Sequence, residues 1–456
     1  MKQEIPKPRR ARVELEAIRA AHSELHERVS VPVTAPSRVR HSAYLLPNEE
    51  EQTRSAVRSA FHDVVRQLGI EPGAIQWGER AGSVEKTFSD GNLLRVVWEL
   101  HTEFYSYTTT LVPPVRARSQ DAFVEPYFLP AFPTTGSKLV DLDLMVVPGR
   151  KLGRAQRASL HGGIIYGGEV VNGEAHAWST FQVDEWGQGR YVVAAGSLKP
   201  GRLGRLIRRL VEIETYYHLI LLPLPEYRKQ VVGLRETEKR IAAYSEDIAA
   251  DLASREAKPE QEHRWLVYLT RDLADLIRLT ERMRYRLSAA NSYYAIFKDR
   301  LEWLRESPGG SYQTLSEFLI ARVSPSMRNY NNFIERADAL TAQLTSLGNM
   351  MRTRVSLNME QQSLQTMNAM NQRAALQLRL QKTVEGLSLI VLSYYLTGLS
   401  NYIFKALEPL LPLPGNPTVW SAMTIPLWLG LAFWMTRRVK ALVSSTPGGV
   451  EKGKSK

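Results

Sequence analysis

The sequence predicts an α+β protein: an N-terminal, mostly antiparallel sheet with covering helices, then a long-helix stalk and a C-terminal pair of transmembrane helices. Three observations support this fold class. Segments up to about residue 198 are rich in Val, Tyr, Phe and Thr and are separated by turn residues, which is typical of strands. After Pro200, apolar residues recur at helical spacing. Two apolar runs without a charge, residues 386–404 and 417–436, come last.

The strand-like segments are short and are punctuated by glycine and asparagine. They span residues 93–110, 139–147, 164–171 and 175–183. Asn172–Gly173 and the pair Gly167–Gly168 predict hairpin connections. Helical patterns at residues 49–68 and around Ser119 are expected to cover the sheet.

Helices are predicted at residues 203–222, 227–255, 260–281 and 282–306, with a break at the proline and glycines of 308–310. A last long helix is predicted to begin near Ser324–Pro325 and to continue into the first apolar run as a stalk. We therefore expect five parts: an α+β domain (1–198), a helical domain (199–323), the stalk (324–382), two transmembrane helices (383–440) and a basic tail (441–456).

Each apolar run is long enough to span a bilayer, since about 20 residues of helix cross the hydrocarbon core. The alternative is a buried helical hairpin in a soluble protein. Basic residues flank both runs, with Arg379 and Lys382 before the first and Arg437 and Arg438 after the second. Because positive residues favour the cytoplasmic side, we expect both termini in the cytoplasm. Residues 1–30 show no export signal. The sequence thus predicts a multi-pass protein of the bacterial inner membrane.

The formal net charge is +12 and there is no cysteine. Disulfides, thiolate zinc sites and a cysteine nucleophile are excluded. No nucleic-acid-binding module is evident, so no nucleic acid partner is expected. The densest basic stretch, residues 199–209, places Arg202, Arg205 and Arg209 near one helix face. Attraction to anionic lipid or simple solvation explains this stretch better than a phosphate ligand.

The half of the stalk nearest the membrane is rich in amides and poor in charge. One heptad stripe, called the amide seam below, holds Asn358, Gln361, Gln365, Asn368 and Gln372. An adjacent stripe holds Leu364, Met367, Asn371, Ala374 and Leu378. A solvent-facing helix normally carries charges instead. The pattern therefore predicts packing against other helices, either of the same chain or of further copies in a homo-oligomeric coiled coil.

Few residues suggest chemistry. Glu99, His101 and Glu103 alternate and would share one face of a strand, where a divalent cation could bind; a polar face that contacts helices is the alternative. His22 and His26 have an i, i+4 spacing but lack the HExxH pattern. Glu214 and His218 fit a hydrogen bond within or between helices. No phosphate-binding loop or serine-hydrolase motif occurs. We do not expect an enzyme.

Five segments resemble successive signatures of one bacterial family, domain of unknown function 3422, the predicted membrane-anchored proteins. They are residues 23–46, 96–108, 205–225, 285–306 and 378–399. The resemblance covers nearly the whole chain and implies a membrane anchor, without implying an activity.

The architecture is also similar to CorA-type divalent-cation channels, homopentamers whose first span lines the pore and ends in Gly-Met-Asn. The corresponding residues here are Gly398–Leu399–Ser400–Asn401, without the methionine. One face of the first span would line a pore in a channel or pack against the second span in an anchor: Gly386, Ser393, Thr397, Gly398, Ser400 and Asn401.

Three functions remain open at this point. The first is a membrane-anchored protein of structural or regulatory role that self-associates through the stalk and first span in the lipid bilayer. The second is a CorA-like divalent-cation channel or transporter. The third is a metal-dependent enzyme, for which a divalent cation would be the cofactor.

Overall fold

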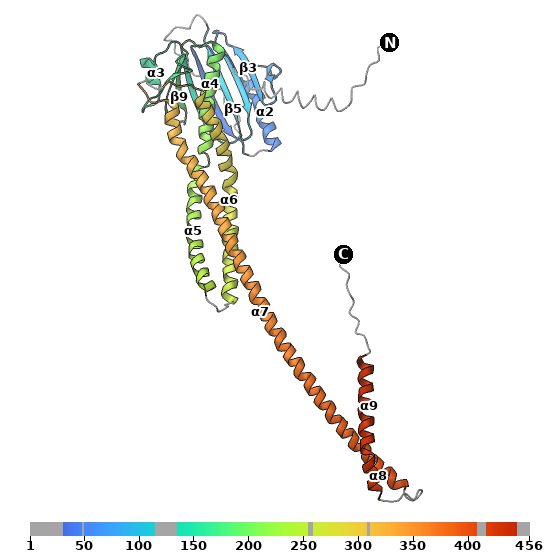
Figure 1. Cartoon of the computed structure of the whole chain (residues 1–456). Helices are drawn as coiled ribbons and strands as arrows, with labels where there is room; N and C mark the ends of the chain where they lie inside the picture. The colour runs from blue at the N-terminus through green and yellow to red at the C-terminus, as the bar shows by residue number, and fades with distance from the viewer. Residues whose placement is uncertain are drawn as a thin grey trace, which may run out of the picture. The chain divides into compact units, whose positions relative to one another are not determined.

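The structure, a computed structural model, describes residues 31–47, 50–114, 135–253, 259–307, 311–407 and 416–444 (Figure 1). The chain divides into two compact units: residues 1–255 with 264–349, and residues 256–263 with 350–456. The predicted helix around Ser119 and the pair His22 and His26 lie outside the described residues.

The first unit contains a nine-stranded sheet in the order β2-β3-β4-β5-β1-β6-β9-β8-β7. All neighbouring pairs are antiparallel except β6 and β9, which are parallel. This arrangement confirms the predicted α+β class. The strands are β1 (Ser37–Leu45), β2 (Gln76–Trp77), β3 (Ala81–Thr87), β4 (Leu93–Leu100), β5 (Phe104–Val112), β6 (Lys138–Val147), β7 (Tyr166–Val170), β8 (Ala175–Val183) and β9 (Gly189–Ala194).

Strand β1 lies at the centre of the sheet and has partners on both sides. Arg38 pairs with Leu111 of β5 and with Met145 of β6. Most of this strand is buried. Residues far apart in the sequence therefore meet on β1.

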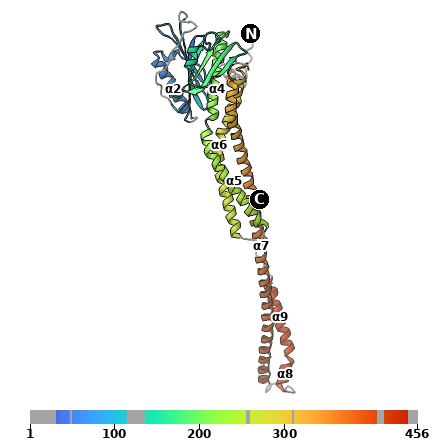
Figure 2. The same ribbon diagram turned by 90° about the vertical axis from the view of Figure 1, so that its left-hand side faces the viewer.

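Helix α2 (Glu51–Gln67) covers one face of the sheet (Figure 2). Phe61 of α2 is fully buried and stacks on Trp98 of β4, with ring centroids 5.9 Å apart. Leu94 and Val96 belong to the same apolar cluster. Because side chains alternate along a strand, Val97 and Glu99 face the other side.

Helix α4 (Pro200–Leu221) lies on that other side, with Leu203, Leu206 and Leu210 buried. Pro200 begins the helix, where its missing N–H costs no hydrogen bond. Gly204 allows close packing, because a Cβ atom there would overlap the carbonyl oxygen of Val31.

The prediction of one strand over residues 93–110 is wrong. Strand β4 ends at Leu100 and β5 begins at Phe104. The N–H of His101 donates to the carbonyl of Phe104 over 2.8 Å and closes a tight turn. The His101 ring also stacks on Phe104, with centroids 4.0 Å apart. Both strands carry the same residue types, so composition hid the turn between them.

The Asn172–Gly173 turn is found between β7 and β8, where Val171, Asn172 and Gly173 all have positive φ. The pair Gly167–Gly168 instead lies inside β7. Gly167 has a φ of +115°, and a Cβ atom there would overlap the carbonyl oxygen of Ala177. Glycine is needed at this position for a close strand approach rather than for a turn.

Three long helices pack together in the first unit: α5 (Leu224–Ala253), α6 (Pro259–Glu302) and the first part of α7 (Leu315–Leu407). Arg240 of α5 pairs with Asp272 of α6, and Arg284 of α6 pairs with Asp338 of α7. Helix α6 is continuous where the sequence suggested two helices. A short helix, α3 (Arg154–Ser159), lies between β6 and β7.

The predicted start of the last helix near Ser324–Pro325 is wrong, since α7 begins at Leu315 and contains Pro325. The N–H of Glu317 donates to the Thr314 hydroxyl, which caps the helix. The Glu306 carboxylate accepts the N–H groups of Leu315 and Ser316, each over 2.8 Å. Buried residues continue at helical spacing past the proline, so packing outweighs its lost hydrogen bond: Leu315, Leu319, Val323, Met327 and Tyr330.

In the second unit, the last part of α7 is followed by α8 (Pro417–Met423) and α9 (Ile425–Ser444). Two helices are long and apolar enough to span a membrane, α7 and residues 418–438. The Trp428 indole of α9 donates to the Ser400 hydroxyl of α7 over 2.7 Å.

Candidate functional site

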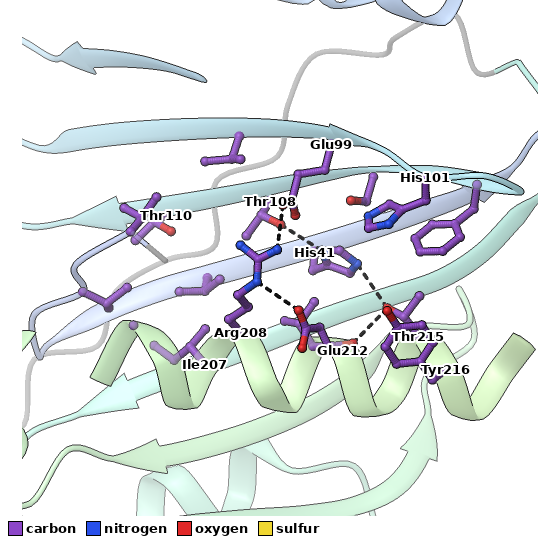
Figure 3. Close-up of a pocket in the computed structure, with 18 residues that line it drawn as sticks. His41, Glu99, His101, Thr108, Thr110, Ile207, Arg208, Glu212, Thr215 and Tyr216 are labelled. Atoms are coloured by element: carbon purple, nitrogen blue, oxygen red, sulfur yellow. Dashed lines mark hydrogen bonds and ion pairs between the residues drawn. The ribbon is translucent and has the colours of Figure 1, made fainter. Parts of the chain in front are cut away.

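A cavity of about 90 Å³ lies between α4 and the sheet face formed by β1, β4 and β5 (Figure 3). Val39, Val97 and Thr110 line it from the strands, and Ile207 and Val211 line it from α4. The cavity has room for several water molecules or for a ligand of a few heavy atoms.

His41 of β1 lies at the centre of this cavity. Its Nδ1 is 2.9 Å from the Thr108 hydroxyl, and its Nε2 is 3.4 Å from the Thr215 hydroxyl. Thr215 donates its proton to the carbonyl of Val211, so it accepts from Nε2. We therefore assign the imidazole proton to Nε2, with Thr108 donating to Nδ1.

Burial lowers the pKa of His41 from 6.5 to about 4. The imidazole is thus neutral near pH 7, and both nitrogens have hydrogen-bond partners. A group with this pKa is a poor general base or acid at neutral pH. His41 is better suited to fix the cavity wall, where it joins β5 to α4 through Thr108 and Thr215.

A chain of alternating charges forms the other wall. Arg208 donates to Glu99 over 2.8 Å and to Glu212 over 2.9 Å. Glu212 also pairs with Arg300 of α6. Burial opposes the charge on Arg208, but the two carboxylates raise its pKa. The chain ties β4, α4 and α6 together.

The structure separates the three metal-binding candidates. Glu99 and His101 border the cavity, and Glu99 is already paired with Arg208. Glu103 lies beyond the turn, where the Tyr293 hydroxyl donates to it over 2.8 Å and Arg286 lies 3.4 Å away. The expectation that all three share one strand face is wrong, because β4 ends before His101. Within the described ranges, no three His, Asp or Glu side chains form a metal site.

Glu214 and His218 occur on adjacent turns of α4. Tyr191 of β9 donates to the Glu214 carboxylate over 2.8 Å, and burial raises the pKa of Glu214. The Nδ1 atom of His218 lies 2.9 Å from the Glu214 carbonyl. The Tyr191 contact holds α4 on the sheet, whereas the His218 contact lies within the helix.

The first residue of the amide seam contacts another helix, whereas the other four are exposed. Asn358 donates to Glu262 of α6 over 2.7 Å, and Arg354 pairs with the same carboxylate. The other four members are exposed in the single chain: Gln361, Gln365, Asn368 and Gln372. The apolar residues beside them are exposed as well, including Leu364, Met367 and Leu378.

The face of the first apolar run divides into two groups. Ser393 and Ser400 are each 5% exposed, and Ser421 of α8 donates to the Asn401 amide oxygen over 3.1 Å. Thr397 is half-buried and donates to the carbonyl of Ser393. Gly386 and Gly398 are exposed, and a Cβ atom at either would meet nothing within 4 Å. The hydroxyls therefore face the second helix, whereas the glycines do not.

Sequence reasoning did not identify His41, Arg208 or Glu212 as partners. No local signal marks His41, because the surrounding sequence, SRVRHSAYL, is largely polar although most of it is buried. The role of His41 could be recognised only from the positions of β1, β5 and α4 in the fold.

Comparisons with known proteins give one match. A family model described as protein of unknown function (DUF3422) matches residues 16–443. No curated protein and no solved structure matches the chain.

Proposed function

The chain belongs to this DUF3422 family of unknown function, and on that premise we propose that it is a membrane-anchored, self-associating protein with a structural or regulatory role. The apolar runs form a two-helix anchor in the bacterial inner membrane. The first unit, called the sheet unit below, lies in the cytoplasm, and no catalytic step is assigned to it.

The observation that carries this proposal is the inverted polarity of the helix pair in the second unit. Leu387 and Ile390 are 62% and 63% exposed, whereas the hydroxyls of Ser393 and Ser400 are buried. In water this arrangement would expose a large apolar surface. In a bilayer, it places apolar side chains against lipid and satisfies the polar groups between the helices.

The orientation follows from the flanking charges. Arg379 and Lys382 precede the first run, and Arg437 and Arg438 follow the second. Positive residues on both flanks favour a cytoplasmic location for both ends of the hairpin.

Self-association is supported by residues 359–384 of α7, nearly all of which are exposed in one chain. Between Glu360 and Arg373 the helix carries no charge. Identical uncharged helices can approach without repulsion, and amide side chains both donate and accept hydrogen bonds. We therefore assign this surface to a second copy of the same chain, packed as a coiled coil.

The channel alternative receives less support. A pore would need Ser400 and Asn401 to face an aqueous path, yet both bond to the second apolar run. An enzyme receives less still, because the cavity around His41 has a neutral imidazole and paired charges.

A topology experiment tests the anchor. A reporter that is active only in the cytoplasm is expected to be active when it is fused after Lys456. The same reporter is expected to be inactive when it is inserted near Pro414, because that loop lies outside. The reverse pattern overturns the orientation, and recovery of the full chain in the soluble fraction overturns the anchor. Light scattering of the purified protein in detergent tests self-association, which a monomeric mass contradicts.

A further inference from the structure

An exposed tryptophan surrounded by arginines lies where α4 meets the end of α6. The Trp303 side chain is 50% exposed. The guanidinium carbon of Arg209 lies 5.5 Å from its ring centroid, and that of Arg300 lies 4.6 Å away. Arg209 also donates to the Trp303 carbonyl over 3.0 Å. These contacts fix two cations beside one aromatic ring.

Positive charge in this cluster exceeds negative charge. Burial lowers the pKa of Arg209, and three nearby arginines lower it further: Arg205, Arg300 and Arg305. Glu212 pairs with Arg300 but is shared with Arg208. In the part of the chain that the structure describes, Arg205 and Arg305 form no salt bridge, and both are exposed. The carboxylate of Glu306 is bound to the N-terminus of α7 instead.

The backbone at Arg305 is unusual for such a residue. Its φ is +48°, in the left-handed region where glycine or asparagine commonly ends a helix. The carbonyls of Leu304 and Arg305 accept the N–H groups of Val171 and Asn172 in the β7–β8 turn, over 2.7 and 3.2 Å. The sheet thus holds Arg305 in a strained conformation, which is a common feature of functional sites.

We propose that Arg205, Arg209 and Arg305, grouped around Trp303, bind a phosphate monoester. Such a group carries nearly two negative charges at neutral pH and offers three acceptor oxygens. Guanidinium groups match it with paired hydrogen bonds, and Arg209 is already positioned by Trp303. A bound phosphate neutralises the excess positive charge of this arginine cluster. The monoester belongs either to a soluble metabolite or to a lipid headgroup.

Calorimetric titration of the full chain in a non-ionic detergent tests this site, with glycerol 3-phosphate and dihexanoyl phosphatidic acid as probes. We expect the variant Arg205→Ala/Arg305→Ala to bind both probes at least about tenfold more weakly, because two charge-assisted contacts are lost. Neither side chain forms a salt bridge with any residue that the structure describes, so the fold is expected to persist. Arg235→Ala, at an exposed arginine of α5, is the matched control.

Equal affinity for the two probes identifies a soluble phosphate as the ligand, and tighter binding of phosphatidic acid identifies a lipid. The proposal is overturned if neither probe binds at millimolar concentration. It is also overturned if the double variant binds both probes as tightly as the control does.

Discussion

The indole of Trp428 donates its hydrogen bond to the hydroxyl of Ser400, 2.7 Å away on the other apolar helix. Ser400 in turn donates to the carbonyl of Leu396 over 2.9 Å. Both polar side chains are therefore satisfied between the helices, where lipid offers no alternative partner.

Trp428→Phe removes this donor while keeping an aromatic ring. We expect the helix pair to lose about 0.6 kcal/mol, the average for an interhelical hydrogen bond in a membrane, and at most about 1.7 kcal/mol. Unfolding in mixed micelles with increasing dodecyl sulfate measures the change. Trp434→Phe is the control, since Trp434 is 53% exposed. Equal losses in the two variants would show that the hydrogen bond contributes nothing specific.

Charge placed in the amide seam is expected to separate the copies. Gln365→Glu/Asn368→Glu brings like charges together around a symmetric interface, so the mass measured by light scattering should fall to that of a monomer. Thr366→Glu/Gln377→Glu adds the same charge on the opposite face of α7 and should leave the oligomer intact. Dissociation by both pairs would point to charge alone rather than to the seam.

Two adjacent glycines of β7 should respond differently to alanine. At Gly167 the left-handed φ alone is expected to cost alanine about 1–3 kcal/mol in backbone strain. The overlap of its Cβ atom with the Ala177 carbonyl oxygen adds to this cost. At Gly168 a Cβ atom meets nothing within 4 Å. Thermal unfolding of the full chain should show a clear fall in Tm for Gly167→Ala and little change for Gly168→Ala. Similar Tm values for the two variants would contradict the close strand approach.

The stability of the sheet unit is expected to fall in mild acid. Burial lowers the pKa of His41 from 6.5 to about 4, so the unfolded chain binds a proton between these pH values that the folded chain does not. His41 alone contributes a loss of roughly 3 kcal/mol, complete near pH 4 and absent above pH 6.5. Denaturant unfolding at several pH values measures it.

His41→Gln should reduce the fall in the free energy of unfolding between pH 6.5 and pH 4, because glutamine does not titrate. Two further groups still titrate in the variant: burial lowers the pKa of His176, which leaves a slope of the same sign, and raises the pKa of Glu214, which contributes a slope of the opposite sign. His263→Gln, at an exposed position, should keep the full slope of the parent protein. An unchanged slope in His41→Gln would show that His41 is not the titrating group.

The sequence predicts elements best where local signals agree. Strand β8 was predicted with its observed bounds, since alternation and the Asn172–Gly173 turn define it. The start of α7 was misplaced because Pro325 is a stronger local signal than the Thr314–Glu317 cap, while tertiary packing favours the longer helix.

The two sites depend on contacts that no local pattern contains. The cavity brings β1, β5 and α4 around His41. The basic stretch of α4 was visible in the sequence, but Trp303 and Arg305 join it from the end of α6. Only the fold shows that the arginines of α4 lie beside the Trp303 ring and Arg305.

The central position of β1 has a consequence for biosynthesis. Ser37 pairs with Val146, and Arg38 with Leu111, so this strand leaves the ribosome long before either partner. A nascent chain that stops before β6 presents β1 with one edge unpaired, which is a site for aggregation. The sheet can therefore close only after β6 and then β9 have been translated, and we expect such non-local pairing to be slow.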